Sequence, residues 1–347
     1  MLKNIFSNIY LSSITLGLIS SIILFSCNRR NQHLDVRQTE SIIHNITTKM
    51  DSFYIDQDKG IKIGNSLQDW YQINKEKIKS WDEFIRLTNE QLYVLSNDKH
   101  LKLYLDFDDS EEDEDYEEQA NAIFQSKSET GKDIINATER LVDYELESGI
   151  SDVRILDDNI GYLALYWIAE SEGDKEVIDD AMLKLKDTKA LIIDIGINIG
   201  GAPFGVKYYS GFMFEEKTHL SSFIMRGMEN SRERWTINED IPTKSFFDKP
   251  IYILTSKKTF SAAESFLFGL KNNGRIIQVG GNTAGGGLFG GTYEVSTSPK
   301  LDLWVSRGKT FNPNNNESWE AIGINPDIIV DYSNALETAI EHIKSNP

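Results

Sequence analysis

The chain has 347 residues, of which 40% are hydrophobic and 26% are charged. This is the composition of a globular protein with enough length for one large domain or two smaller ones. The formal net charge is -18, and ten of the thirteen residues at positions 106–118 are acidic. Such a surface repels phosphate backbones, so the composition argues against nucleic acid as a partner, and the acidic run itself is typical of a solvated loop or helix face.

The first residues are typical of a targeting segment. Lys3 supplies a positive charge, an apolar stretch covers residues 9–25, and Ser26 and Cys27 close it. The stretch is short for a stand-alone membrane span. Cys27 is the only cysteine of the chain, so it has no partner for an internal disulfide.

A lone cysteine after a small residue at the end of an apolar run resembles the lipobox of bacterial lipoproteins. The resemblance implies a signal peptide over residues 1–27, lipidation of Cys27, and a polar tether over residues 28–40. An uncleaved anchor with an incidental thiol is the alternative. Both interpretations predict a bacterial cell-envelope protein that faces the periplasm or the cell surface and contacts the membrane through its N-terminus.

The segment that follows predicts a small helical domain over residues 41–98. Apolar side chains recur there at helical spacing, first from Ile42 to Phe53 and then from Trp81 to Leu95. The alternation of Leu101, Leu103 and Leu105 with polar residues predicts a half-buried strand. This strand opens a linker region at 99–151, which also holds the acidic run and an amphipathic stretch at 134–146.

The pattern changes after residue 152, where apolar strands alternate with helical segments. The expected strands cover 160–167, 190–195, 251–255 and 276–279, and the expected helices cover 177–185, 262–271 and 334–343. This alternation predicts an α/β core over residues 152–347 with mostly parallel strands.

The segment from Ile251 to Phe268 passes from a buried strand through a short turn into a helix that begins at Ser261. The N–H groups at a helix start are unpaired and carry partial positive charge, so a hydroxyl there can act as a nucleophile and the N–H of Ala262 can stabilise an oxyanion. Ser261 and Glu264 also fit a capping box, which needs no catalysis. The spacing is compatible with both roles.

Glycines follow two of the expected strands, at positions 196, 200 and 201 and again at 280–287. Neither group has the spacing of a P-loop or of a dinucleotide-binding fingerprint, which disfavours phosphate binding. Close approach of the backbone to a ligand and simple tight turns remain two explanations.

A serine nucleophile needs a base. The chain has five histidines, of which His33 falls in the tether and His44 and His342 on helices near the chain ends. His100 stands at the start of a strand, where an exposed histidine is one interpretation and a base is another. His219 is the competing candidate.

The segment Thr255-Ser-Lys-Lys-Thr-Phe-Ser-Ala-Ala-Glu264 resembles the nucleophile segment of the tail-specific (C-terminal-processing) proteases, in the branch of the tricorn core and interphotoreceptor retinoid-binding protein. Four further segments agree in the same order, namely those at 159–162, 191–201, 279–286 and 319–327. The resemblance implies a crotonase/ClpP-like α/β core, a polypeptide substrate, and chemistry without a metal or organic cofactor.

Residue by residue, the resemblance assigns Ser261 as nucleophile, His100 as general base and Glu320 as the supporting acid. The oxyanion hole corresponds to the N–H groups of Ala262 and of either Gly200 or Gly201. A lysine base, used elsewhere in the family, would fall on Lys271, whose motif does not fit. No PDZ module is recognisable between the histidine motif and the core.

Departures from the family pattern keep a second function open. Gly196 replaces a common arginine, Lys99 precedes the histidine where the tricorn branch has serine, and Ala321 replaces a common glycine. The sequence thus favours a serine peptidase that acts on exported polypeptides through an acyl-enzyme. The alternative is an inactive relative that binds peptide or apolar ligands at the cell envelope.

Overall fold

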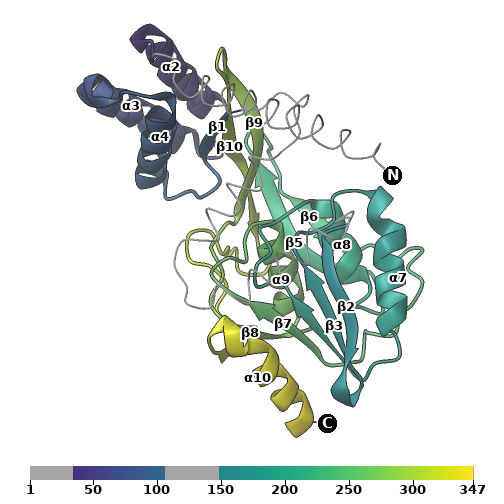
Figure 1. Cartoon of the computed structure of the whole chain (residues 1–347). Helices are drawn as coiled ribbons and strands as arrows, with labels where there is room; N and C mark the ends of the chain where they lie inside the picture. Colours follow the sequence, from purple (N-terminus) through teal and green to yellow (C-terminus); the bar gives the residue numbers. More distant parts are fainter. Residues whose placement is uncertain (1–33, 106–147, 347) are drawn as a thin grey trace, which may run out of the picture. The chain divides into compact units, whose positions relative to one another are not determined.

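The computed structural model describes residues 34–105 and 148–346, which form two compact units (Figure 1). The described part of unit 1 comprises residues 34–97, 101–105 and 292–305, and that of unit 2 comprises residues 98–100, 148–291 and 306–346. Cys27, the acidic run and the amphipathic stretch at 134–146 lie outside the described residues. None of the described helices is long and apolar enough to cross a membrane.

The described part of unit 1 contains three α-helices, α2 (Val36–Phe53), α3 (Gln57–Asn74) and α4 (Trp81–Ser96). Their first turns are capped by the side chains of Asp35, Asp56 and Ser80, each of which accepts a backbone N–H. The apolar faces, including Ile46 and Leu67, are fully buried in one core. The helical N-terminal region predicted from the periodicity is confirmed.

Strand β1 (Lys102–Leu105) completes unit 1 by antiparallel pairing with residues 301–304 of β10 (Lys300–Phe311), with Leu103 opposite Leu303. The remainder of β10, from Gly308 to Phe311, pairs in unit 2 with β5 (His219–Met225), which pairs in turn with β6 (Arg232–Trp235). Strand β9 (Leu288–Thr297) also pairs with β10.

The main sheet of unit 2 has the order β11-β8-β7-β4-β3-β2. All pairs are parallel except β2 with β3, which confirms the predicted α/β core with mostly parallel strands. The strands are β2 (Ile150–Leu156), β3 (Ile160–Leu165), β4 (Ala190–Asp194), β7 (Ile251–Thr255), β8 (Ile277–Gly280) and β11 (Ile328–Ile329).

Helices cover both faces of this sheet because its strands are apolar on both sides. Alternate residues such as Leu191 and Ile193 face the core formed with α7 (Lys175–Leu185), α8 (Pro203–Gly211) and α9 (Ala262–Asn272). The residues between them, such as Ile192, face α10 (Tyr332–Ser345) on the opposite side (Figure 1).

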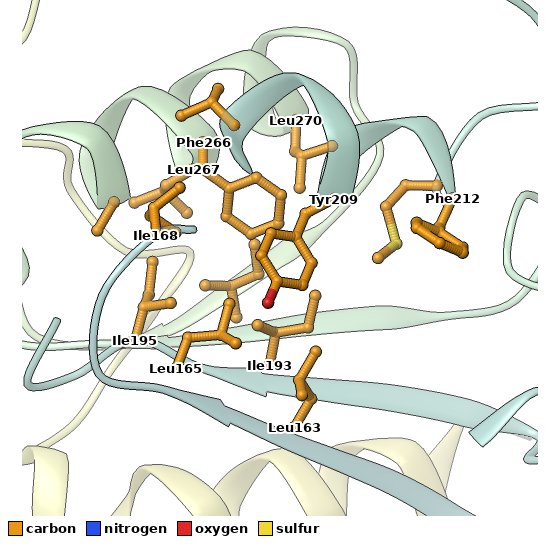
Figure 2. Close-up of a cluster of buried hydrophobic side chains, with 14 of the residues drawn as sticks. Leu163, Leu165, Ile168, Ile193, Ile195, Tyr209, Phe212, Phe266, Leu267 and Leu270 are labelled. Atoms are coloured by element: carbon orange, nitrogen blue, oxygen red, sulfur yellow. The ribbon is translucent and has the colours of Figure 1, made fainter. Parts of the chain in front are cut away.

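Figure 2 shows the larger of these two cores, in which Tyr209 of α8 and Phe266 of α9 project toward Leu163 and Ile193 of the strands. The four side chains are 0% exposed. Burial of an aromatic or branched side chain of this size stabilises a fold by about 1.5–3 kcal/mol. The core therefore fixes α9, and with it the turn before α9, against the end of the sheet.

Candidate active site

Three loops meet at one edge of the main sheet because β4, β7 and β8 are parallel and end on the same side. The turn after β4 carries the glycines at 196, 200 and 201. The turn after β7 carries Ser261, and the loop after β8 carries the glycines at 280–287. Sequence reasoning identified all three loops, and the topology explains why they lie together.

The turn before α9 holds Ser261 in an unusual backbone conformation. Ser261 has φ 57° and ψ -116°, a region that costs a non-glycine residue about 1–3 kcal/mol and is found mainly at functional sites. The Thr259 hydroxyl donates to Ile195 O over 2.8 Å, and the Phe260 N–H donates to Asn198 O over 3.0 Å. These bonds tie the turn to the loop after β4 and so maintain the strained geometry.

His100 lies within hydrogen-bond distance of the Ser261 hydroxyl. The atoms His100 Nε2 and Ser261 Oγ are 2.9 Å apart, which is the contact a general base needs with its nucleophile. The imidazole stacks on Phe260, with ring centroids 4.3 Å apart, and the His100 backbone N–H donates to Asp98 Oδ1. Since His100 is only 9% exposed, its interpretation as an exposed strand-end histidine is wrong.

The competing bases are engaged elsewhere. His219 Nε2 lies 2.9 Å from Ser221 O, and its ring stacks on Trp235. His342 Nδ1 is 2.8 Å from the Tyr252 hydroxyl. The Lys271 ammonium forms an ion pair with Asp327 and donates to Gln278 and Asn325.

Glu264 is a buried carboxylate directly behind the nucleophile turn. One oxygen accepts hydrogen bonds from the Thr283 hydroxyl and the Gly285 N–H, and the other accepts from the N–H groups of Gly286 and Ser261. Burial raises the pKa of this carboxyl group, and the four hydrogen bonds oppose that rise. The bond from the Ser261 N–H is the predicted capping contact, and it joins α9 to the loop after β8.

Glu320 lies beside the same loop. Its Oε2 atom accepts from the N–H groups of Gly287 and Leu288 over 2.7 and 2.9 Å. Burial, aided by the charge of Asp98, raises the pKa of Glu320 to about 7. Gly286 of this loop lies against the base, because a Cβ at Gly286 would lie 2.8 Å from His100 Cε1.

The glycine turn after β4 approaches the nucleophile closely. A Cβ on Gly200 would lie 3.4 Å from Ser261 Oγ and 3.5 Å from the Ala262 nitrogen, and φ of 131° at Gly200 is itself a glycine conformation. The Gly200 N–H donates to Asn198 Oδ1. Ala262 is the first residue of α9, so its N–H has no acceptor within the helix.

Two of the departures from the family pattern have structural counterparts. The Lys99 ammonium donates to Ala284 O in the loop after β8. Gly196 lies against the ring of Tyr332, which donates through its hydroxyl to the buried carboxylate of Asp194 over 2.9 Å. Asp194 also accepts the Gly196 N–H. Both positions thus support loops of the site.

A protein-family comparison matches residues 159–330 to the family described as Peptidase family S41. Residues 159–330 form a domain of this family. The match includes Ser261 and Glu320, whereas His100 lies upstream of it. The resemblance to the tail-specific proteases, predicted from five ordered motifs, is thereby confirmed.

Solved structures share the fold. A lipoprotein from Streptococcus agalactiae aligns with a TM-score of 0.55 and 18% identity over 91% of this chain and 99% of its own. A candidate peptidase from Parabacteroides merdae aligns with a TM-score of 0.58 and 18% identity over 89% of this chain and 95% of its own. The tricorn protease aligns with a TM-score of 0.53 and 11% identity over 90% of this chain but only 37% of its own. At such identities the likeness concerns the fold.

The sequence did not predict that two acidic residues, Asp98 and Glu264, belong to the site. Asp98 was not singled out, although it stands two residues before His100, and Glu264 was assigned only a capping role. The signal for Glu264 was its place one turn after Ser261, where a carboxylate faces the N–H groups of the helix start. Its bonds to Gly285 and Gly286 depend on a loop about twenty residues away, which spacing does not reveal.

Proposed function

We propose that this family S41 member is an active serine peptidase that hydrolyses peptide bonds in exported polypeptides through a Ser261–His100–Glu320 acyl-enzyme mechanism. The observation that carries the proposal is the 2.9 Å contact between His100 Nε2 and Ser261 Oγ at a strained turn that opens a helix. A hydroxyl held this way by an imidazole is an activated nucleophile.

In the proposed reaction, Ser261 Oγ attacks the substrate carbonyl carbon while His100 Nε2 accepts the hydroxyl proton. The oxyanion is stabilised by the N–H of Ala262 and by an N–H of the glycine turn at 200–201. Protonated His100 then donates its proton to the leaving amine, and the acyl-enzyme is hydrolysed by a water that His100 deprotonates. Glu320 supports the imidazolium through its negative charge.

The oxyanion donor in the glycine turn is either Gly200 or Gly201. The Gly200 N–H already donates to Asn198. The parallel bridge between Ile168 and Gly201 uses the carbonyl of Gly200 and the N–H of Ala202, which leaves the Gly201 N–H outside that bridge. This difference favours Gly201 as the partner of Ala262.

A fluorophosphonate probe tests the nucleophile in the full-length chain. We expect covalent labelling at Ser261, identified by mass spectrometry of the modified peptide, and its loss in Ser261→Ala and His100→Ala. The control His44→Ala, in which an exposed histidine of α2 is changed, should label normally. Peptide hydrolysis should fall about 10³-fold or more in both site variants.

The same experiment separates the peptidase from an inactive binding relative. A folded wild-type chain that neither labels nor cleaves any member of a mixed peptide library contradicts the peptidase and supports a binding protein for peptide or apolar ligands. Labelling that persists in Ser261→Ala refutes the nucleophile assignment. The departures at Gly196 and Lys99 favour neither function, since both residues take part in the loops of the site.

The proposed location is the bacterial cell envelope, with Cys27 as the lipidated residue. The support is the sequence of the first 27 residues. Incorporation of labelled palmitate by cells that produce the full-length chain tests this. We expect incorporation by the parent chain and none by Cys27→Ser, and equal incorporation by both would refute the anchor.

A further inference from the structure

Arg234 is a buried arginine close to the nucleophile helix. It lies on β6, and its side chain is 9% exposed. Its Nη1 atom donates to Ser265 Oγ over 2.8 Å, and its guanidinium carbon lies 5.5 Å from the ring centroid of Phe223. The mechanism described above does not use this cation.

No carboxylate neutralises Arg234 among the residues that the structure describes. Burial lowers the pKa of its guanidinium to about 10, and no described acidic residue opposes the change. The adjacent Glu233 accepts the indole N–H of Trp235 instead. A buried arginine is normally paired with an acid or saturated with hydrogen bonds, since removal of the charge from water is costly.

Arg275 shows how this fold treats a structural arginine. Its guanidinium donates to three backbone carbonyl groups, those of Met213, Phe246 and Lys249. Arg234, by contrast, has the single side-chain hydrogen bond to Ser265 within the described part of the chain. The remaining N–H groups of Arg234 form a planar fork that matches a carboxylate.

The position of Ser265 relates this fork to the reaction. Ser265 lies on α9 one helical turn after the N-cap residue Ser261, because its N–H donates to Ser261 O over 2.9 Å, and a turn of this kind spans about 6 Å along the axis. An extended peptide advances about 3.3–3.6 Å per residue. A carboxylate on Arg234 would therefore belong to a substrate residue about one or two positions from the scissile bond.

We propose that Arg234 binds a substrate carboxylate next to the scissile bond and so directs this peptidase to acidic sites. The inference rests on the proposed peptidase function and names its substrate class. The carboxylate has two sources, an aspartate or glutamate side chain or the C-terminal carboxylate of a polypeptide cleaved close to its end. Both would form the same paired hydrogen bonds with the guanidinium.

The test uses internally quenched peptides and the full-length chain. The peptides of one set are identical except that each carries either aspartate or asparagine at one of the two positions on either side of the cleaved bond. A second set carries neutral side chains and ends in a free acid or an amide near that bond. We expect the wild type to prefer the carboxylate-bearing member of one set by about 10-fold or more in kcat/KM, and the responding set identifies the source.

Arg234→Met keeps the apolar stem and removes the charge, so it should lower kcat/KM for the preferred peptide about 10- to 100-fold and change that of the neutral peptide by less than about twofold. Arg234→Lys keeps the charge without the fork and should be intermediate. Arg232→Met changes an exposed arginine of the same strand and is the matched control.

Equal cleavage of acidic and neutral peptides by the wild type overturns the proposal, and so does an equal loss on all peptides in Arg234→Met and Arg234→Lys. The wild-type preference needs no variant, so it decides even if Arg234→Met does not fold. Fluorophosphonate labelling of Ser261 distinguishes a failure of the proposed role of Arg234 from a failure of the proposed peptidase function. Labelling without a carboxylate preference refutes only the role of Arg234, whereas a folded chain without labelling refutes the peptidase and this inference together.

Discussion

The ring of Tyr332 occupies the space that a side chain at position 196 would fill. A Cβ added to Gly196 would come within 1.9 Å of Tyr332 Cε2, and the Tyr332 hydroxyl donates to Asp194 two residues before this glycine. The first residue of α10 is therefore packed against the turn that carries Gly200. An arginine at position 196, common in the family, is incompatible with this arrangement.

Gly196→Ala should destabilise the protein by about 1–3 kcal/mol, because the tyrosine ring must move and overpacking is costly. Urea unfolding measures the change. Gly291→Ala is the control, since an added Cβ there has no atom within 4 Å. The double variant Gly196→Ala/Tyr332→Ala should lose less stability than the sum of the losses in the two single variants, by about 0.5–3 kcal/mol. If the two losses simply add, the contact between these residues is contradicted.

Replacement of Ser261 should reveal the strain of its backbone. Because φ is 57° and ψ is -116°, Ser261→Gly should be more stable than Ser261→Ala by about 1 kcal/mol or more, although both lose the nucleophile. At Ser265, inside α9, the order should reverse, since glycine costs about 1 kcal/mol relative to alanine in a helix. Thermal unfolding of the glycine and alanine variants at both positions measures which variant is the more stable at each position.

Glu264→Gln should disorganise the site without a change in side-chain size. Both oxygens of Glu264 accept two hydrogen bonds, and an amide NH₂ in place of one oxygen would face two donors. We expect a loss of about 2–5 kcal/mol in stability, as for a broken buried network, and loss of fluorophosphonate labelling. Glu337→Gln, on the exposed face of α10, should behave as wild type, and a fully labelled Glu264→Gln protein would refute the positioning role.

Glu320 should make stability depend on pH in the acidic to neutral range. Burial raises its pKa from 4.5 in the unfolded chain to about 7, so the folded state binds the proton more tightly than the unfolded chain. The stabilisation is fully present below pH 4.5 and is lost as the pH rises through 7, with a total of at most about 3 kcal/mol. Urea unfolding at several pH values measures it.

In Glu320→Gln this part of the pH dependence should disappear, because the amide does not titrate and still accepts the N–H groups of Gly287 and Leu288 through its oxygen. Above pH 7 the variant should thus be the more stable protein, while its activity falls. Parallel stability profiles of Glu320→Gln and wild type would contradict the raised pKa.

Much of the core could be predicted from the sequence because its signals are local. The strand at Ile251–Thr255 and the helix from Ala262 were predicted to within a residue, since an apolar run, a turn and a capping pair stand next to one another. Strands β5, β6 and β9 were not predicted individually. Their sequences lack a clean alternation of apolar and polar residues, and β6, for example, consists of Arg-Glu-Arg-Trp.

Parts of the site could not be predicted because they depend on contacts across long sequence separations. His100 is 161 residues from Ser261, and only the family resemblance selected it over His219. The tyrosine that fills the space beside Gly196 is 136 positions further along the chain, so the sequence alone presented this glycine only as a departure from the family pattern. Arg234 carries no motif, and it stands out only because it is buried without a carboxylate partner among the described residues.

The candidate base lies at the start of the linker region, whereas the candidate nucleophile lies in the core that follows this region. The short segment Asp98–His100 groups with unit 2, although the residues on both sides of it group with unit 1. A chain that begins at Ile150 would therefore contain Ser261 and Arg234 but would lack His100. The proposed chemistry therefore requires the segment Asp98–His100 in addition to the core that begins at Ile150.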